Sequence, residues 1–303
     1  MTDTDSATLH ALSKQLAVGA YQAVVNEVTN PATRLHSETA ARQRRVVLAR
    51  AYLAQGRAKM AAETLAGGDE ATHTHEARAL ALLAASALDT ASASASSAGA
   101  AAVALDAADD GDVAVLAAST LLNAGRPLDA LAVLAPFRHR SLDAAALFVQ
   151  ALLLINRPDI ARQEIAALKA WADDASLAQL AEAWCALSDT DANRAQDAFY
   201  TFDELASAGA ATAKLLISKA VAQILSSKFA EAEQLLAQAL NWNNSDPEAL
   251  INLIVCANAT GKPADVTAGY IKQLKDAAPN HIYLQELQLK EDLFDRCAQK
   301  FSV

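Results

Sequence analysis

Apolar positions along the chain follow a helical spacing, and small and bulky residues alternate among them in a fixed order. A small residue is followed one helical turn later by a bulky one, and this pair recurs every 34 residues: Ala198 with Phe202, Ala232 with Leu236, and Val266 with Tyr270. Positions near the start of each repeat keep the same interval: Ala186, Ala220 and Ile254. The pattern predicts repeated helical units rather than strands, in which side chains would alternate at every second residue.

A period of 34 residues is typical of the tetratricopeptide repeat, which is a helix–turn–helix unit. The small residue lets the second helix of a unit approach the first, and the bulky residue fills the gap between neighbouring units. One unit cannot bury its own apolar face, so neighbours must stack to form a continuous core. We therefore expect an all-α, tetratricopeptide-like α-solenoid, in which helix–turn–helix pairs form a right-handed superhelix.

Looser copies of the small–bulky pair lie upstream: Val24 with Val28, Ala61 with Leu65, Ala130 with Leu134, and Ala161 with Ile165. No copy is found in residues 90–102, a Ser/Ala-rich segment with almost no large side chains. It reads either as a degenerate helix pair or as a poorly packed helix followed by a loop. Because no shift in composition marks a boundary, we expect residues 1–303 to form a single α-solenoid of about seven to eight helix pairs, with a C-terminal capping helix.

Helix boundaries are also marked in the sequence. Asp246 followed by Pro247 is typical of a helix N-cap and first helical residue, because the aspartate accepts free backbone N–H groups and proline has none to leave unpaired. Pro127 and Pro158 fit the starts of two further helices for the same reason.

Composition and charge narrow the possible functions. Apolar residues make up 53% of the chain, which contains only 10 Gly and 7 Pro, so disorder and a strand-rich fold are both disfavoured. A net charge of −10 argues against binding to nucleic acid or to anionic lipid. Charge-free apolar runs such as residues 113–125 are too short to span a membrane, and the acidic N-terminus lacks the features of a targeting signal. We expect a cytoplasmic protein that meets other proteins.

Motifs for catalysis or for a cofactor are missing from the sequence. There is no glycine-rich phosphate loop and no His-Glu-x-x-His zinc motif. The cysteines stand far apart and form neither a disulfide framework nor a zinc site: Cys185, Cys256 and Cys297. Glu70, His73 and His75 come nearest to a metal cluster, but they lie in a loop-like stretch without the further ligands that a metal site needs. We expect no catalytic residue, no cofactor and no bound metal.

Several segments carry a more specific resemblance than the repeat pattern does. They are Arg50-Ala51-Tyr52-Leu53, Gly261-Lys262-Pro263, Gln273-Leu274-Lys275-Asp276-Ala277 and Phe294-Asp295-Arg296. In order and spacing, the chain from about residue 19 to residue 303 resembles the epsilon subunit of coatomer, the coat of Golgi-derived vesicles. The chain departs from that family's pattern in residues 65–118, where Ala and Ser replace most of it.

The resemblance implies a non-enzymatic, structural subunit of the coatomer coat. It further implies that the protein binds the C-terminal region of the alpha subunit of coatomer by wrapping a superhelix around it. Such a subunit would support Golgi-to-ER retrograde and intra-Golgi vesicle transport. It would be cytoplasmic and peripheral on the cytosolic face of Golgi membranes and coated vesicles, with membrane association only through the coat.

The geometry of the repeat predicts which residues would meet a partner. The inner lining of such solenoids comes from the first helix of each pair. On this basis we expect the partner-binding residues to include Val46, Arg50, Leu53, Val115, Ser119 and Leu122.

Two alternatives remain at this point. The first is another tetratricopeptide interaction scaffold, such as a co-chaperone that holds an acidic peptide tail in a groove lined by Lys and Asn. The acidic balance and the scarcity of groove lysines argue against it. The second is an all-α enzyme, against which the missing motifs argue.

Overall fold

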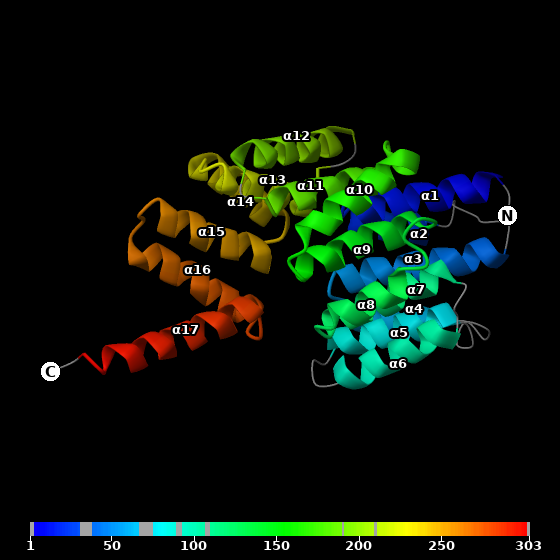
Figure 1. Ribbon diagram of the computed structural model, residues 1–303, viewed down its shortest axis with the longest axis horizontal. Coiled ribbons are helices and arrows are strands. Elements are labelled where there is room, and N and C mark those ends of the chain that lie inside the picture. The colour runs from blue at the N-terminus through cyan, green and yellow to red at the C-terminus, as the bar shows by residue number, and fades with distance from the viewer. Residues whose placement is uncertain are drawn as a thin grey trace. The chain divides into compact units, whose positions relative to one another are not determined.

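The structure is a computed structural model that describes residues 3–30, 38–66, 75–88, 93–106, 110–189, 191–208 and 211–301. The expected all-α fold is confirmed: within these ranges there are seventeen helices and no strand (Figure 1). Their bounds are α1 (Asp3–Ala17), α2 (Tyr21–Thr29), α3 (Glu38–Ala54), α4 (Ala58–Ala66), α5 (His75–Leu88), α6 (Ala93–Asp106), α7 (Gly111–Asn123), α8 (Pro127–Leu134), α9 (Leu142–Leu154), α10 (Pro158–Ala172), α11 (Ser176–Leu187), α12 (Ala192–Ala208), α13 (Ala213–Leu225), α14 (Phe229–Trp242), α15 (Pro247–Ala259), α16 (Ala264–Ala277) and α17 (Ile282–Ala298).

The chain divides into two compact units. The first comprises residues 1–189 with 207–210 and contains α1 to α11, and the second comprises residues 190–206 and 211–303 and contains most of α12 together with α13 to α17. Contacts in the first unit follow the order of a solenoid, because each odd-numbered helix packs on the even-numbered helix after it and on the next odd-numbered helix. In addition, α1 contacts α11, so the two ends of the first unit meet. That one solenoid runs through residues 1–303 stays a prediction.

The small–bulky pairs found in the sequence lie on the second helices, and most of their side chains are buried, as predicted. The pairs in which both members are buried are Val24 with Val28, Ala130 with Leu134, Ala161 with Ile165, Ala198 with Phe202, and Ala232 with Leu236. Ala61 is also buried, whereas the side chain of Leu65 lies outside the described residues. Val266 and Tyr270 are half-buried, and Tyr270 packs against apolar clusters between α13 and α17. The repeat read from the sequence is therefore the packing unit of the fold.

Six of the turns between paired helices share one backbone feature. The first helix is followed there by a residue in the left-handed region: Gly19, Gly56, Gly125, Asn156, Ser227 and Gly261. At Gly125, φ is 71° and a Cβ atom would meet nothing within 4 Å, so the backbone angle rather than lack of space favours glycine. At the start of α15, Asp246 is the N-cap as predicted, since its Oδ1 accepts from the backbone N–H groups of Glu248 and Ala249 at 3.1 and 3.3 Å.

The Ser/Ala-rich segment forms part of α6, apart from residues 90–92, which lie outside the described residues. This helix packs on both α5 and α7, and its buried residues are small or of medium size: Ser96, Ser97, Ala100 and Val103. A Cβ atom on Gly99 would come within 3.1 Å of Leu82 of α5, so the lack of large side chains allows a close approach of the two helices. In residues 93–106, small side chains are thus buried against both neighbouring helices, and the interpretation of residues 90–102 as a degenerate segment stays a prediction.

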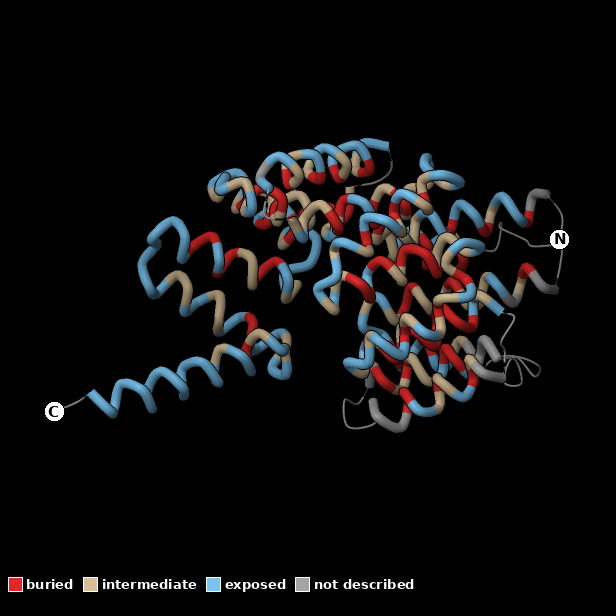
Figure 2. Tube along the Cα trace, viewed as in Figure 1, coloured by how far each residue is buried: buried red, intermediate tan, exposed pale blue. Residues whose placement is uncertain are grey.

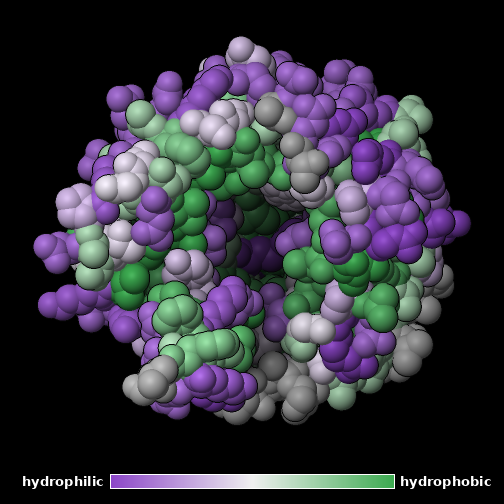
Figure 3. All heavy atoms as spheres, turned by 60° about the vertical axis from the view of Figure 1, so that its left-hand side comes forward, coloured by the Kyte–Doolittle hydropathy of each residue, from purple (hydrophilic) through white to green (hydrophobic). Residues whose placement is uncertain are grey.

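Solvent exposure is greatest at the C-terminal helix. Beyond its first turn, α17 is almost entirely exposed (Figure 2), and it carries exposed apolar side chains: Ile282, Leu289, Leu293 and Phe294. Across the face drawn in Figure 3, hydrophobic residues reach the surface between hydrophilic ones. Among the described helices, none is both long enough and apolar enough to cross a bilayer.

Candidate functional site

A cavity of about 270 Å³ lies within the first unit. Its walls come from α1, α3, α7 and the start of α9, which are all first helices of their pairs. The lining residues are Ser6, Leu9, His10, Ser13, Gln43, Val46, Val47, Arg50, Asp112, Val115, Leu116 and Asp143. The cavity therefore lies on the side of the unit where the repeat geometry places a partner.

Helical spacing explains why these residues share one space. On α1 and α3, the lining positions lie three, four and seven residues after the first one, and on α7 they lie three and four residues after it. Residues with this spacing share one face of a helix, and on all three helices that face lines the cavity. The floor is apolar and buried, and consists of Leu9, Val47, Val115 and Leu116. Polar side chains such as Gln43 stand exposed around it. The cavity therefore combines buried apolar side chains with exposed polar ones.

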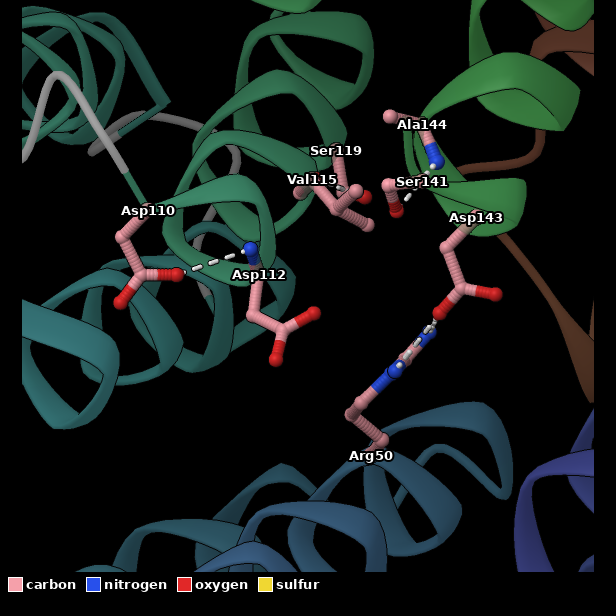
Figure 4. Close-up of polar contacts among 8 residues, drawn as sticks. All are labelled: Arg50, Asp110, Asp112, Val115, Ser119, Ser141, Asp143 and Ala144. Carbon is pink, nitrogen blue, oxygen red and sulfur yellow. Dashed lines mark hydrogen bonds and ion pairs between the residues drawn. The ribbon is translucent and has the colours of Figure 1, made fainter. Parts of the chain in front are cut away.

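One ion pair crosses the cavity from α3 to α9. Arg50 donates from both Nη1 and Nη2 to Oδ2 of Asp143, each at 3.3 Å (Figure 4). Asp143 lies in the first turn of α9, where the Oγ of the N-cap Ser141 accepts from the backbone N–H of Ala144. The side chains of Arg50 and Asp143 remain 30% and 36% exposed, so the pair is open to solvent. Arg50 is therefore occupied by a charge of its own chain, although it is accessible from the cavity.

A second carboxylate, that of Asp112, enters the cavity from the start of α7. The N-cap Asp110 fixes this turn, because its Oδ1 accepts from the backbone N–H groups of Asp112 and Val113 at 3.0 and 3.3 Å. Asp112 is exposed, but the neighbouring protein still displaces part of the water around its carboxyl and raises the pKa of that group above its ordinary value. The charges of Asp110 and Asp143 raise the pKa further, whereas Arg50 lowers it. Among the described residues, the Asp112 carboxylate has no hydrogen bond or ion pair.

This environment predicts a stability effect that depends on pH. A carboxyl whose pKa is raised by folding destabilises the fold while it is ionised, and the penalty is lost as the pH falls through the raised pKa. Asp112→Asn should therefore raise the free energy of unfolding near pH 7, and the gain should shrink toward pH 4. Urea denaturation followed by circular dichroism measures both values.

The matched control is Asp265→Asn, because Asp265 is, like Asp112, an exposed second residue of its helix, but it does not line the cavity. Both variants lose the same favourable interaction of an acid with a helix N-terminus. If Asp112→Asn is less stable than Asp265→Asn near pH 7, the environment described for Asp112 is wrong.

The six residues expected to bind a partner fall into two groups. Val46, Arg50 and Val115 line the cavity together. Leu53 and Leu122 do not line the cavity; they are half-buried and pack against the same apolar clusters as Val46 and Val115. The sixth, Ser119, is half-buried and donates from Oγ to the backbone carbonyl of Val115 at 2.8 Å. Partner binding by these residues stays a prediction.

Sequence reasoning missed the α1 wall and the two aspartates. Ser6, Leu9, His10 and Ser13 have the spacing of one helix face, which could have been recognised. The position of Asp143 could not be inferred, because it depends on how α9 lies relative to α3, 93 residues earlier in the chain.

A metal site finds no support in the described part of the chain, where no group of three or more His, Cys, Asp or Glu side chains could hold an ion. Glu70 and His73 lie outside the described residues, as does the side chain of His75.

A family model described as "Coatomer epsilon subunit" matches residues 5–302. The chain belongs to the coatomer epsilon subunit family. This confirms the resemblance seen in the sequence and makes the chain a subunit of the coatomer coat, a structural component in vesicle transport.

Similar proteins span nearly the whole length. Coatomer subunit epsilon-2 of Oryza sativa subsp. japonica is 31% identical over 295 residues, covering 97% of each chain. Coatomer subunit epsilon of Caenorhabditis elegans is 30% identical over 290 residues, covering 96% of this chain and 97% of its own. The similarity to coatomer epsilon subunits therefore extends over both units of the chain.

Solved structures confirm the tetratricopeptide-like solenoid. A tetratricopeptide repeat protein from Parabacteroides merdae superimposes with a TM-score of 0.59 at 11% identity, covering 82% of this chain and 97% of that one. A chain of the APC/C hetero-tetramer Cut9-Hcn1 superimposes with a TM-score of 0.56 at 13% identity, covering 82% of this chain and 48% of that one. At such low identity these likenesses concern the fold alone.

Proposed function

We propose that this coat subunit binds the C-terminal region of the alpha subunit of coatomer along the inner side of its first unit. Through that link it supports Golgi-to-ER retrograde and intra-Golgi transport, on the cytosolic face of Golgi membranes and coated vesicles. The observation that carries the proposal is the cavity, which unites Val46, Arg50 and Val115 from the first helices. Membership of the coatomer epsilon subunit family supports the proposal, because it makes the chain part of the same coat as the alpha subunit.

The lining of the cavity supports a protein partner. Buried Val47, Val115 and Leu116 offer apolar contact at the centre, and Arg50 provides the kind of side chain that is enriched in binding hot spots. A stable interface buries about 800 Å² on each partner, which exceeds the area of one small cavity. The cavity is therefore one anchor point of a larger interface along the first helices.

The charge of the cavity disfavours the co-chaperone alternative. A groove for an acidic peptide tail needs basic side chains, whereas Asp112 and Asp143 place two carboxylates beside the single guanidinium of Arg50. An acidic tail would meet like charges there, and such contacts weaken binding.

Blocking the cavity tests the proposal. Gln43 lines the cavity and is exposed, so Gln43→Trp adds bulk there without entering the core. We expect this variant to bind the alpha-subunit region at least about tenfold more weakly, because a partner side chain can no longer reach the floor. Isothermal titration with the full chain measures the affinity.

The control is Gln163→Trp, which makes the same change at an exposed position of α10, a second helix. It should bind as the wild type does. Unchanged binding by Gln43→Trp, with circular dichroism equal to that of the wild type, would show that the cavity is not part of the interface.

A further inference from the structure

We propose that the cavity of the first unit receives one basic side chain of the coatomer partner, whose cationic end pairs with the carboxylate of Asp112 and whose aliphatic part lies on the apolar floor. This inference rests on the proposed function, since it specifies the chemistry of the group that enters the site. Figure 4 shows Asp112, Arg50 and Asp143 extending into the same space from three different helices.

The size of the cavity suits a single long side chain. Small-molecule and cofactor sites usually measure about 300–1,000 Å³, and bury most of their ligand. At about 270 Å³ and with an open polar rim, this cavity falls just below that range. A side chain that a partner backbone carries into place needs no larger enclosure.

The charges that line the cavity are unbalanced. Two carboxylates, those of Asp112 and Asp143, line the cavity with one guanidinium, that of Arg50. His10 is the remaining titratable residue of the described lining, which includes no lysine. Arg50 directs both of its terminal nitrogens to Oδ2 of Asp143. The Asp112 carboxylate has no hydrogen bond or ion pair among the described residues, and the nearby guanidinium of Arg50 is directed to Asp143 instead. A cation entering at Asp112 would restore the balance.

The floor determines which kind of cation fits. Val47, Val115 and Leu116 are buried and contiguous with the position of Asp112, which lies one turn before Val115 and Leu116 on the same face of α7. Lysine and arginine bury their methylene groups along such surfaces while keeping the charged end at a polar rim. A metal ion or a small hydrophilic cation would gain nothing from the apolar floor.

The direct test is Asp112→Asn in the full chain, measured by isothermal titration against the C-terminal region of the alpha subunit. Loss of a charged hydrogen-bond partner should weaken binding about tenfold. Asp265→Asn removes an exposed acid at the same position of another helix and should change the affinity less than about twofold. A merely structural role for Asp112 would weaken binding only by unfolding the chain, so the free variant must also be at least as stable as the wild type.

A double-mutant cycle identifies the entering side chain. Each Lys and Arg of the alpha-subunit region is replaced in turn by Met, which keeps the aliphatic part and removes the charge. One such replacement should weaken binding to the wild-type chain about tenfold and have little further effect with Asp112→Asn, because both changes break the same pair.

The possible failures are distinguishable. If the wild-type chain does not bind the alpha-subunit region at all, both the proposed function and this inference are wrong. If the wild type binds and Asp112→Asn binds equally well, or if no basic residue of the partner couples to Asp112, the proposed function stands and the inference is overturned.

Discussion

Phe202→Ala should reduce the stability of the chain by about 3–5 kcal/mol, because the substitution leaves a cavity that the surrounding side chains fill only in part. Phe202 is fully buried, with 0% exposure, and it is the bulky member of the repeat pair on α12. The free energy of unfolding of a native protein is about 5–15 kcal/mol, so this one substitution removes a large share of it. Urea denaturation followed by circular dichroism measures the loss.

The same substitution at Phe294 provides the control. Phe294 lies on α17 with 72% exposure, so that Phe294→Ala creates no cavity and should change stability by less than about 0.5 kcal/mol. Equal effects of the two variants would mean that the bulky positions of the repeat do not carry the packing of the units.

Arg50→Glu should destabilise the first unit by about 1–3 kcal/mol. This lies between the stability lost when an exposed ion pair is broken and the stability lost when a buried one is broken. The change removes the guanidinium from the cavity wall and places a third carboxylate beside Asp112 and Asp143. The loss should be greatest near neutral pH and should shrink as the pH falls, because the carboxylates that repel one another in the folded state then become protonated and lose their charge. Urea denaturation at several pH values tests both statements.

The matched control is Arg140→Glu, at an exposed position in the turn after α8. It makes the same change in net charge and should have an effect of less than about 0.5 kcal/mol. If the two variants are equally stable at neutral pH, the ion pair between α3 and α9 contributes nothing to the fold. A parallel change at Leu53 would not test binding, since Leu53 packs against the apolar core of the first unit.

Local pattern was sufficient to predict the fold. The small–bulky pairs, such as Ala232 with Leu236, are set by the spacing of a helix and by contacts between sequence neighbours. The N-cap at Asp246 likewise depends only on the residues that follow it. The Ser/Ala-rich segment was harder to read, because a helix without large side chains shows no apolar stripe, although Gly99 and Ser97 can bring it close to its neighbours.

The candidate site could be predicted only in part. Repeat geometry places the first helices at the inner side, and this found Val46, Arg50 and Val115. It could not separate them from Leu53 and Leu122, because the side of a first helix that faces its neighbours and the side that faces the cavity are both apolar. Nothing in the sequence pattern singles out Asp112 and Asp143, because only the positions of α3, α7 and α9 in space bring them to one cavity.

The contact between α1 and α11 changes how the first unit should come apart. A linear array of repeats loses its terminal helices first, since each repeat touches only its neighbours and an end has one neighbour fewer. In this unit, however, the first and last helices support each other, and Arg50 with Asp143 adds a link across 93 residues of chain. Unfolding of either α1 or α11 then exposes surface on the other helix. We therefore expect residues near the N-terminus to unfold together with the centre of the unit rather than before it. We expect this closure to slow folding. The part of α1 that packs on α11 is covered only when a helix more than 150 residues later in the chain has formed.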